Sequence, residues 1–103
     1  MVSRGDVWLV LPDVPGATEA QPCVVLSPPE IHDHLGAVTV APMTAGGAAA
    51  AYRVPFTVGE QTGLIRLEQI RTVEKRALTR QVGALERKTL TAALATLREM
   101  FAE

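Results

Sequence analysis

An arginine and a glutamate two positions apart are the residues best suited to chemistry in this sequence. Arg66 and Glu68 lie in the segment GLIRLEQIRTV, residues 63–73. If this segment is a β-strand, Arg66 and Glu68 share one face, and Ile65 and Leu67 share the other. A carboxylate can accept a proton and a guanidinium can stabilise a developing anion, so such a pair could carry out acid–base catalysis. Taken alone, the same spacing is more often a surface ion pair.

The alternation of apolar side chains is interrupted directly after this pair. Ile70 comes one residue too early to continue the series of Ile65 and Leu67. A β-bulge or bend near Gln69 would reconcile the two registers and re-aim the side chains around it. Bulges are enriched beside active sites, although bulges with a purely structural role are commoner.

Other side chains with reactive groups form weaker patterns. His32 and His34, with Asp33 between them, lack a third well-placed ligand, so we expect no metal site. Cys23 lies in an apolar run and is expected to pack in the core. Tyr52 is the aromatic residue best placed to stack on a nucleic-acid base.

Six short stretches rich in β-branched and apolar residues predict the strands that position these groups. They are residues 5–11, 21–27, 37–43, 53–58, 63–68 and 70–73. Short strands at this close spacing favour a small barrel. Residues 29–34 could form one helical turn before Gly36. Residues 45–51 (AGGAAAA) predict a mobile loop, with an alanine-rich helical turn as the alternative.

The C-terminal segment changes its period from that of a strand to that of a helix. Apolar residues recur on one helical face at Leu90, Leu94, Leu97 and Phe101. This spacing predicts an amphipathic helix over residues 86–102 that covers a sheet too small to bury its own faces. Trp8 and Phe101 are both expected to pack against apolar neighbours.

The length of 103 residues fits one globular domain, residues 1–103, with no room for a second. No apolar run approaches the roughly 20 residues of a membrane-spanning helix, and no signal pattern follows Met1. The single cysteine cannot close a disulfide within the chain. We therefore expect a cytoplasmic protein without a membrane anchor.

Charge is distributed unevenly along the chain, although the net charge is only −1. Residues 1–52 carry one basic and five acidic side chains, whereas residues 53–103 carry nine basic and six acidic ones. Five of the nine basic residues lie within residues 66–80. If they share a face they form a positive stripe suited to a polyanion, although ordinary solvated charge is the commoner explanation of such a count.

Several motifs in order along the chain resemble one family from end to end. They are RGDVW at 4–8, PCVVLSP at 22–28, APMT at 41–44, GLIRLEQIRTVE at 63–74, KRAL at 75–78 and GAL at 83–85. With these motifs at these spacings, the chain is identified as a member of the MazF/PemK family of toxins from bacterial type II toxin-antitoxin systems.

The resemblance implies an SH3-like β-barrel with a C-terminal helix, acting as a homodimer. It implies a sequence-selective endoribonuclease, an mRNA interferase, that cleaves single-stranded RNA without a metal or other cofactor and so inhibits growth. Such an enzyme uses the 2′-hydroxyl of the RNA as nucleophile and leaves 2′,3′-cyclic phosphate and 5′-hydroxyl ends. It also implies a cognate MazE/PemI-like antitoxin, whose peptide would cover the RNA groove and contact the basic residues Arg66, Arg71, Lys75 and Arg76.

Residue roles follow from the same resemblance. Glu68 matches the acidic position that PemK-like members use as base, and Arg66 matches its arginine partner. Thr44 matches the strand-end threonine that hydrogen-bonds the scissile phosphate, although it could also be a simple turn residue. Gln69 and Arg71 match supporting positions, and a structural role suits Arg71 equally well.

One departure from the family pattern concerns phosphate binding. Many members carry an arginine before the proline of the second strand, where this chain has Gln21. Glutamine donates a hydrogen bond but brings no charge, so part of the phosphate stabilisation is lost unless Arg66 compensates. Gln21 supports one alternative to the nuclease, a catalytically impaired relative that binds RNA or antitoxin. A second alternative is a gyrase poison, because the related CcdB toxins use a similar barrel.

Overall fold

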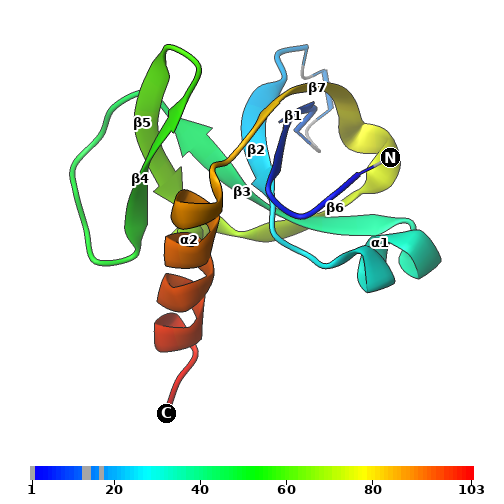
Figure 1. The fold of residues 1–103 in the computed structure, drawn as a ribbon. Helices are drawn as coiled ribbons and strands as arrows, with labels where there is room; N and C mark the ends of the chain where they lie inside the picture. Colours follow the sequence, from blue (N-terminus) through cyan, green and yellow to red (C-terminus); the bar gives the residue numbers. More distant parts are fainter. Residues whose placement is uncertain (1, 13–14, 17) are drawn as a thin grey trace.

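The computed structural model describes the chain except for Met1, Asp13, Val14 and Ala17. The described residues form seven strands, two α-helices and two short 3-10 helices (Figure 1). The strands are β1 (Asp6–Val10), β2 (Gln21–Val25), β3 (Ala37–Thr44), β4 (Arg53–Val58), β5 (Gln61–Arg66), β6 (Arg71–Glu74) and β7 (Leu78–Ala84). The helices are α1 (Pro29–Leu35), α2 (Arg87–Met100) and the 3-10 helices η1 (Leu67–Gln69) and η2 (Lys75–Ala77).

Strand β3 joins the two halves of the sheet. The strand order is β4-β5-β3-β2-β1-β7, and β6 also pairs with β3. Residues 37–40 at the start of β3 pair with β6, whereas Met43 and Thr44 at its end pair with β5. The sheet therefore bends along β3 into a half-barrel (Figure 1). This confirms the predicted fold, which is mainly β with a C-terminal helix.

Helix α2 covers the larger of two buried apolar clusters. Leu90, Leu94 and Leu97 pack against this cluster, which includes Ile65 and Leu67 of the segment that carries Arg66 and Glu68. The predicted amphipathic helix is therefore confirmed. Figure 1 shows α2 beside the β4–β5 hairpin and α1 at the opposite end of β3.

The expected packing of Phe101 is wrong. The helix ends at Met100, and Phe101 has φ −107° and ψ 7°, outside helical geometry. The phenylalanine ring therefore leaves the apolar face of the helix, and the residue is 71% exposed. Trp8, in contrast, is half-buried against the second cluster, as expected.

Three further features differ from the prediction. Strand β7 was not predicted, because only Leu78 is buried and the rest of the strand shows no apolar alternation. Strand β5 runs from Gln61 to Arg66 rather than over 63–68. The break in alternation is not a β-bulge near Gln69; a turn of 3-10 helix, Leu67–Gln69, makes the bend instead.

The polar segment between β2 and β3 forms helix α1, in agreement with the predicted helical turn. Gly36 follows it with φ +63°, a conformation that ends helices and favours glycine. His32 is 1% exposed, whereas Asp33 and His34 are exposed, so the three side chains do not converge. Within the described part of the chain, no helix is long and apolar enough to span a membrane.

Cys23 lies on β2 in the second cluster and is fully buried, as predicted. Burial raises the pKa of its thiol to about 11, and the nearby Arg71 only partly opposes this. Because the thiolate is the reactive form, iodoacetamide at about pH 8 should leave Cys23 unmodified in the folded protein and alkylate it in guanidinium chloride. Mass spectrometry measures both, and rapid alkylation of the folded protein would contradict the buried position.

Candidate active site

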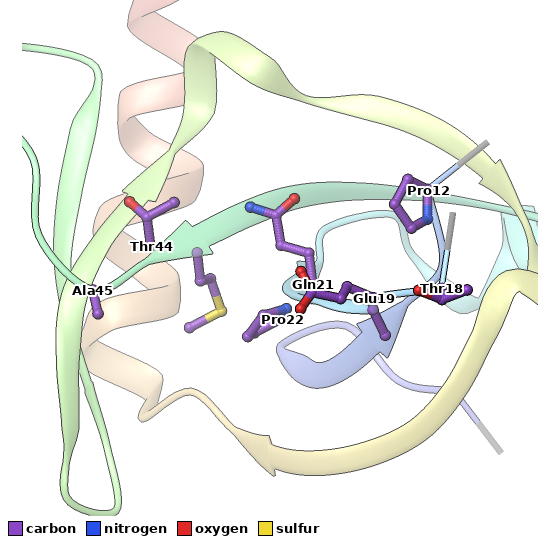
Figure 2. A pocket seen from close by; sticks show the side chains of 9 residues that line it. Pro12, Thr18, Glu19, Gln21, Pro22, Thr44 and Ala45 are labelled. Atoms are coloured by element: carbon purple, nitrogen blue, oxygen red, sulfur yellow. The ribbon is translucent and has the colours of Figure 1, made fainter. Parts of the chain in front are cut away.

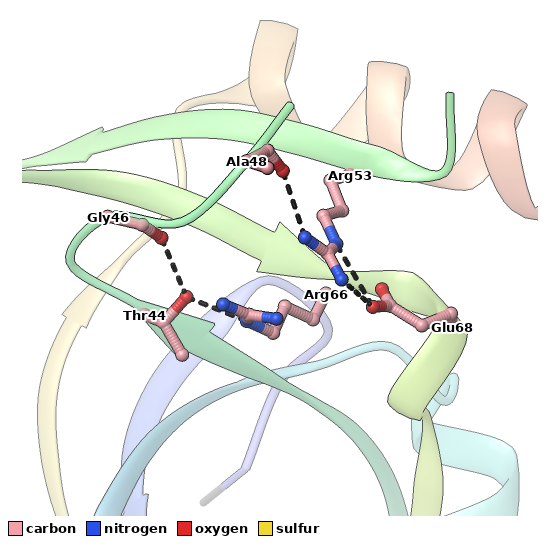
Figure 3. A network of polar contacts seen from close by, with 6 residues as sticks. All are labelled: Thr44, Gly46, Ala48, Arg53, Arg66 and Glu68. Carbon is pink, nitrogen blue, oxygen red and sulfur yellow. Dashed lines mark hydrogen bonds and ion pairs between the residues drawn. The ribbon is translucent and has the colours of Figure 1, made fainter. Parts of the chain in front are cut away.

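Thr44 and Arg66 meet at the outer face of the sheet, where β3 pairs with β5. Thr44 lies opposite Leu64, and Leu64 and Arg66 project to the same side of β5. The Arg66 Nε–H donates a 2.9 Å hydrogen bond to the Thr44 hydroxyl oxygen (Figure 3). That hydroxyl donates a longer bond, 3.3 Å, to the Gly46 carbonyl. The two predicted site residues are therefore in direct contact.

Two glycines allow the backbone to come this close to the site. A Cβ on Gly63 would lie 2.0 Å from the Thr44 carbonyl oxygen, so no other residue fits there without movement of β3 or β5. Gly47 has φ +109°, and a Cβ there would lie 2.7 Å from Arg66 Nη2. The residues 45–52 thus form a loop that passes over the Arg66 guanidinium; it contains no helix, so the helical alternative is wrong.

Glu68 is close to this pair but is not the ion-pair partner of Arg66. Strand β5 ends at Arg66, and η1 places the Glu68 carboxylate against Arg53 of β4. Arg53 donates to Glu68 Oε2 from Nε at 3.0 Å and from Nη2 at 2.7 Å (Figure 3). The predicted Arg66–Glu68 pair on one face of a strand is therefore wrong, because the strand does not continue to Glu68.

Arg53 was not predicted as a site residue, although a signal for it exists in the sequence. Arg53 lies directly opposite Arg66 in the β4–β5 hairpin. Val58 pairs with Gln61, so Gly59 and Glu60 form a two-residue turn, and Gly59 has φ +60°. Such a turn fixes the register of a hairpin, and this register brings Arg53 to Arg66.

The Glu68 carboxylate is held in its ionised form. The hydrogen bonds from Arg53 lower its pKa below the usual range, and the charges of Arg53 and Arg66 act in the same direction. A carboxyl with a lowered pKa stays charged at neutral pH and is protonated only in more acidic solution. Both bonds from Arg53 go to Oε2, and no other side chain in the described residues hydrogen-bonds Oε1.

A pocket of about 750 Å³ adjoins Thr44 (Figure 2). Its lining includes Gln21, half-buried at the start of β2, and Glu19 in the preceding loop. Gln21 and Thr44 thus share a cavity, but the position that would carry a positive charge has an uncharged amide. The loop of residues 12–20 lies partly outside the described residues.

Tyr52 and Gln69 are the two other predicted site residues near Glu68 in the chain or through a backbone contact. The Tyr52 carbonyl accepts a 3.3 Å hydrogen bond from the Leu67 N–H, and Tyr52 is 39% exposed. Gln69 is exposed at the end of η1. Both residues are accessible to solvent.

The other basic residues form a separate surface. Arg71 and Arg76 line a second pocket, of about 780 Å³, together with Leu11 and Pro12. Arg76 is ion-paired with Glu74, and Lys75 is half-buried in η2. This second pocket and the pocket beside Thr44 share Pro12.

The arrangement can bind an anion and move a proton. Arg66 has further N–H groups beside the Thr44 hydroxyl, and an ionised carboxylate lies next to them. Among the residues that the structure describes, no three side chains of His, Cys, Asp or Glu come together as metal ligands.

Comparison with known proteins gives one family and one fold. Residues 3–101 match the model of the PemK-like, MazF-like toxins of type II toxin-antitoxin systems. Among solved structures, the chain is similar to the Mycobacterium tuberculosis toxin MazF-mt6, with 24% identity, a TM-score of 0.77 and coverage of 93% of this chain and 95% of that one. It is also similar to an endoribonuclease in complex with its cognate antitoxin from a mycobacterial species (20%, 0.83, 96% and 93%). A third similar structure is the MazE-MazF complex, form II, from Deinococcus radiodurans (19%, 0.80, 98% and 95%). No match was found among curated proteins.

Proposed function

This chain belongs to the family of PemK-like, MazF-like toxins of type II toxin-antitoxin systems, and on that premise we propose that it is a sequence-selective endoribonuclease acting on single-stranded RNA. The observation that carries the proposal is one ionised carboxylate, Glu68, beside the hydrogen-bonded pair of Arg66 and Thr44. These groups can take a proton and stabilise charge on a phosphate. RNA supplies the remaining reactant itself.

Glu68 acts as the general base in this proposal. It removes the proton from the 2′-hydroxyl, whose oxygen then attacks the adjacent phosphorus and displaces the 5′-oxygen, and this leaving oxygen takes a proton from solvent water. The products are a 2′,3′-cyclic phosphate and a 5′-hydroxyl. A lowered pKa makes Glu68 a modest base, but it keeps the carboxylate ready over the whole neutral range.

Arg66 and Thr44 stabilise the charge that develops on the phosphoryl oxygens. A guanidinium is not deprotonated in proteins, so Arg66 acts better by electrostatic stabilisation than as a proton donor. The Thr44 hydroxyl can donate to a phosphate oxygen if it releases its long bond to the Gly46 carbonyl, while the Arg66 Nε–H continues to hold its oxygen.

The proposal assigns substrate binding around this centre to three further residues, Gln21, Gln69 and Tyr52. Gln21 shares the pocket with Thr44 and donates a hydrogen bond to a neighbouring phosphate without adding charge. Tyr52 offers an exposed ring on which a base can stack, and stacking on aromatic side chains is a common way to hold single-stranded RNA. Arg71, which lines the second pocket, and Lys75 support the binding of RNA or of the antitoxin.

The protein acts in the cytoplasm as a homodimer and is inhibited by a MazE/PemI-like antitoxin. Two of the structures similar to it are complexes of a toxin with an antitoxin. A basic C-terminal half offers charge complementarity to an acidic peptide. A dimer adds buried surface to a chain with a small core.

Cleavage of a long, defined single-stranded RNA in EDTA tests this function. We expect discrete cuts whose ends, mapped by mass spectrometry, are cyclic phosphate and 5′-hydroxyl, and we expect EDTA to leave the rate unchanged. If the protein binds RNAs of varied sequence but cleaves none of them, the result would favour the catalytically impaired relative, the alternative that Gln21 supports. Inhibition of gyrase without RNA cleavage would instead favour the CcdB-like alternative.

A further inference from the structure

We propose that Arg53 is a positioning residue for Glu68 in the RNA cleavage proposed above, and that it couples this carboxylate to the loop of residues 45–52. The proposal rests on the endoribonuclease function and on a contact in which one guanidinium joins the carboxylate and the loop. Arg53 Nη1–H donates a 2.9 Å hydrogen bond to the Ala48 carbonyl while Nε and Nη2 hold Glu68.

The cross-strand position of Arg53 is the first argument for a role beyond local stability. Arg53 and Arg66 are directly opposite each other in the β4–β5 ladder. Like charges at such a position destabilise a sheet unless an anion lies between or beside them. Glu68 is the anion that the chain supplies, and an RNA phosphate would be a second one. The hairpin thus concentrates two guanidinium groups where the proposed substrate reacts.

The geometry of the Arg53–Glu68 contact sets the orientation of the base. Two donors of one planar guanidinium converge on Oε2, which restrains the carboxylate more than one flexible ammonium contact could. Oε1 has no side-chain partner in the described residues, and it is the oxygen that the proposal assigns to the 2′-hydroxyl. The Arg53 side chain is 19% exposed and the Glu68 side chain 24%, and the pair lies at the surface of the protein.

The loop is tied to both arginines. Besides the Nη1 bond to Ala48, the Arg53 backbone N–H donates to the Ala50 carbonyl at 3.1 Å. Gly47, one residue before Ala48, lies directly over Arg66 Nη2. A change in the loop, such as RNA binding over Tyr52, would therefore move the guanidinium that holds Glu68.

The test compares Arg53→Gln and Arg53→Lys with wild type on an RNA that contains one cleaved site, over a range of pH. We expect Arg53→Gln to lower kcat by about tenfold to a hundredfold, the loss that misplacement of a catalytic group causes. The acidic limb of kcat/KM should move to higher pH, because without Arg53 the pKa of Glu68 rises towards its ordinary value. Arg53→Lys keeps the charge but not the two-pronged contact, so kcat should fall while the acidic limb stays closer to that of wild type.

Arg87→Gln is the matched control, since it removes an exposed arginine from the first turn of α2 and should leave kcat and the pH profile unchanged. An unshifted acidic limb in Arg53→Gln, or a kcat of wild-type size in Arg53→Lys, would overturn the proposal. If Arg53→Gln fails to give a cooperative melting transition, the Arg53→Lys comparison decides.

A second measurement separates this proposal from the proposed function. The pKa of the Glu68 carboxyl can be measured by NMR titration in the free protein, without any RNA. If wild type cleaves no RNA but the Glu68 pKa still rises in Arg53→Gln, the nuclease function fails while the positioning contact stands. If wild type cleaves RNA and the Glu68 pKa is unchanged by the substitution, Arg53 is not its positioning residue.

Discussion

Glu68→Gln is expected to lower kcat for RNA cleavage by about 10²–10⁴, the contribution typical of a general base. Glutamine has nearly the same shape and its amide oxygen can still accept the hydrogen bonds of Arg53, so the local structure should persist. What is lost is the ability to take the proton of the 2′-hydroxyl. Single-turnover cleavage of a defined RNA by each protein measures the effect on the chemical step.

Glu60→Gln is the matched control for this experiment, because it makes the same exchange at an exposed position in the β4–β5 turn. It should cut RNA at the wild-type rate. The Glu68→Gln protein should still fold, with a melting temperature somewhat below that of wild type, because the anion beside Arg53 and Arg66 is lost. Full cleavage by Glu68→Gln would remove Glu68 from the mechanism and leave the assignment of the base open to another residue.

Gly63→Ala is expected to have the largest effect on stability. The added Cβ would lie 2.0 Å from the Thr44 carbonyl oxygen. Both atoms are fixed to the backbone, so rotation of a side chain cannot relieve the clash. Overpacking typically costs about 1–3 kcal/mol, and a rigid backbone contact places this site at the upper end. For a domain of this size each kcal/mol lowers the melting temperature by roughly 4–8 °C. Calorimetry or circular dichroism measures the shift.

The same substitution should reduce cleavage in whatever protein remains folded, since separation of β3 from β5 pulls Thr44 away from Arg66. Thr62→Ala serves as the control, because it changes an exposed position on the same strand and should alter stability by no more than about 0.5 kcal/mol. A Gly63→Ala protein with the melting temperature of wild type would show that the two strands tolerate a wider spacing.

Most helices and strands could be predicted from the sequence because each of them buries one apolar face and exposes the other. Strand β4 was predicted with its observed bounds, Arg53–Val58, since Val54 and Phe56 are buried between exposed or half-buried neighbours. Helix α2 was found because three leucines on one face pack against the core. Strand β7 was missed because it is exposed. It pairs with β1 through backbone hydrogen bonds, and such pairing does not require a pattern of apolar residues.

The sequence predicted which residues belong to the site, but it did not predict the partner of Glu68. Thr44 and Arg66 were both named in advance, and the structure brings them together. The partner of Glu68 was misassigned because a strand was extrapolated through η1, and Arg53 lies in a neighbouring strand 15 residues earlier in the chain. Residue propensities do not predict a contact of this kind. It could be predicted only from the register of the β4–β5 hairpin.

The position of β3 between distant partners has a consequence for how the protein matures during its synthesis. Thr44 leaves the ribosome before Arg66 and Glu68 exist, and α2, which covers Ile65 and Leu67 on either side of Arg66, is made last. Pairing between strands that are far apart in sequence must wait for the intervening chain. Because domains fold as units, nascent chains that stop before α2 expose the apolar side chains on which Arg66 depends. Activity should therefore switch on only with a full-length chain, and premature termination should yield inert fragments rather than weak enzymes.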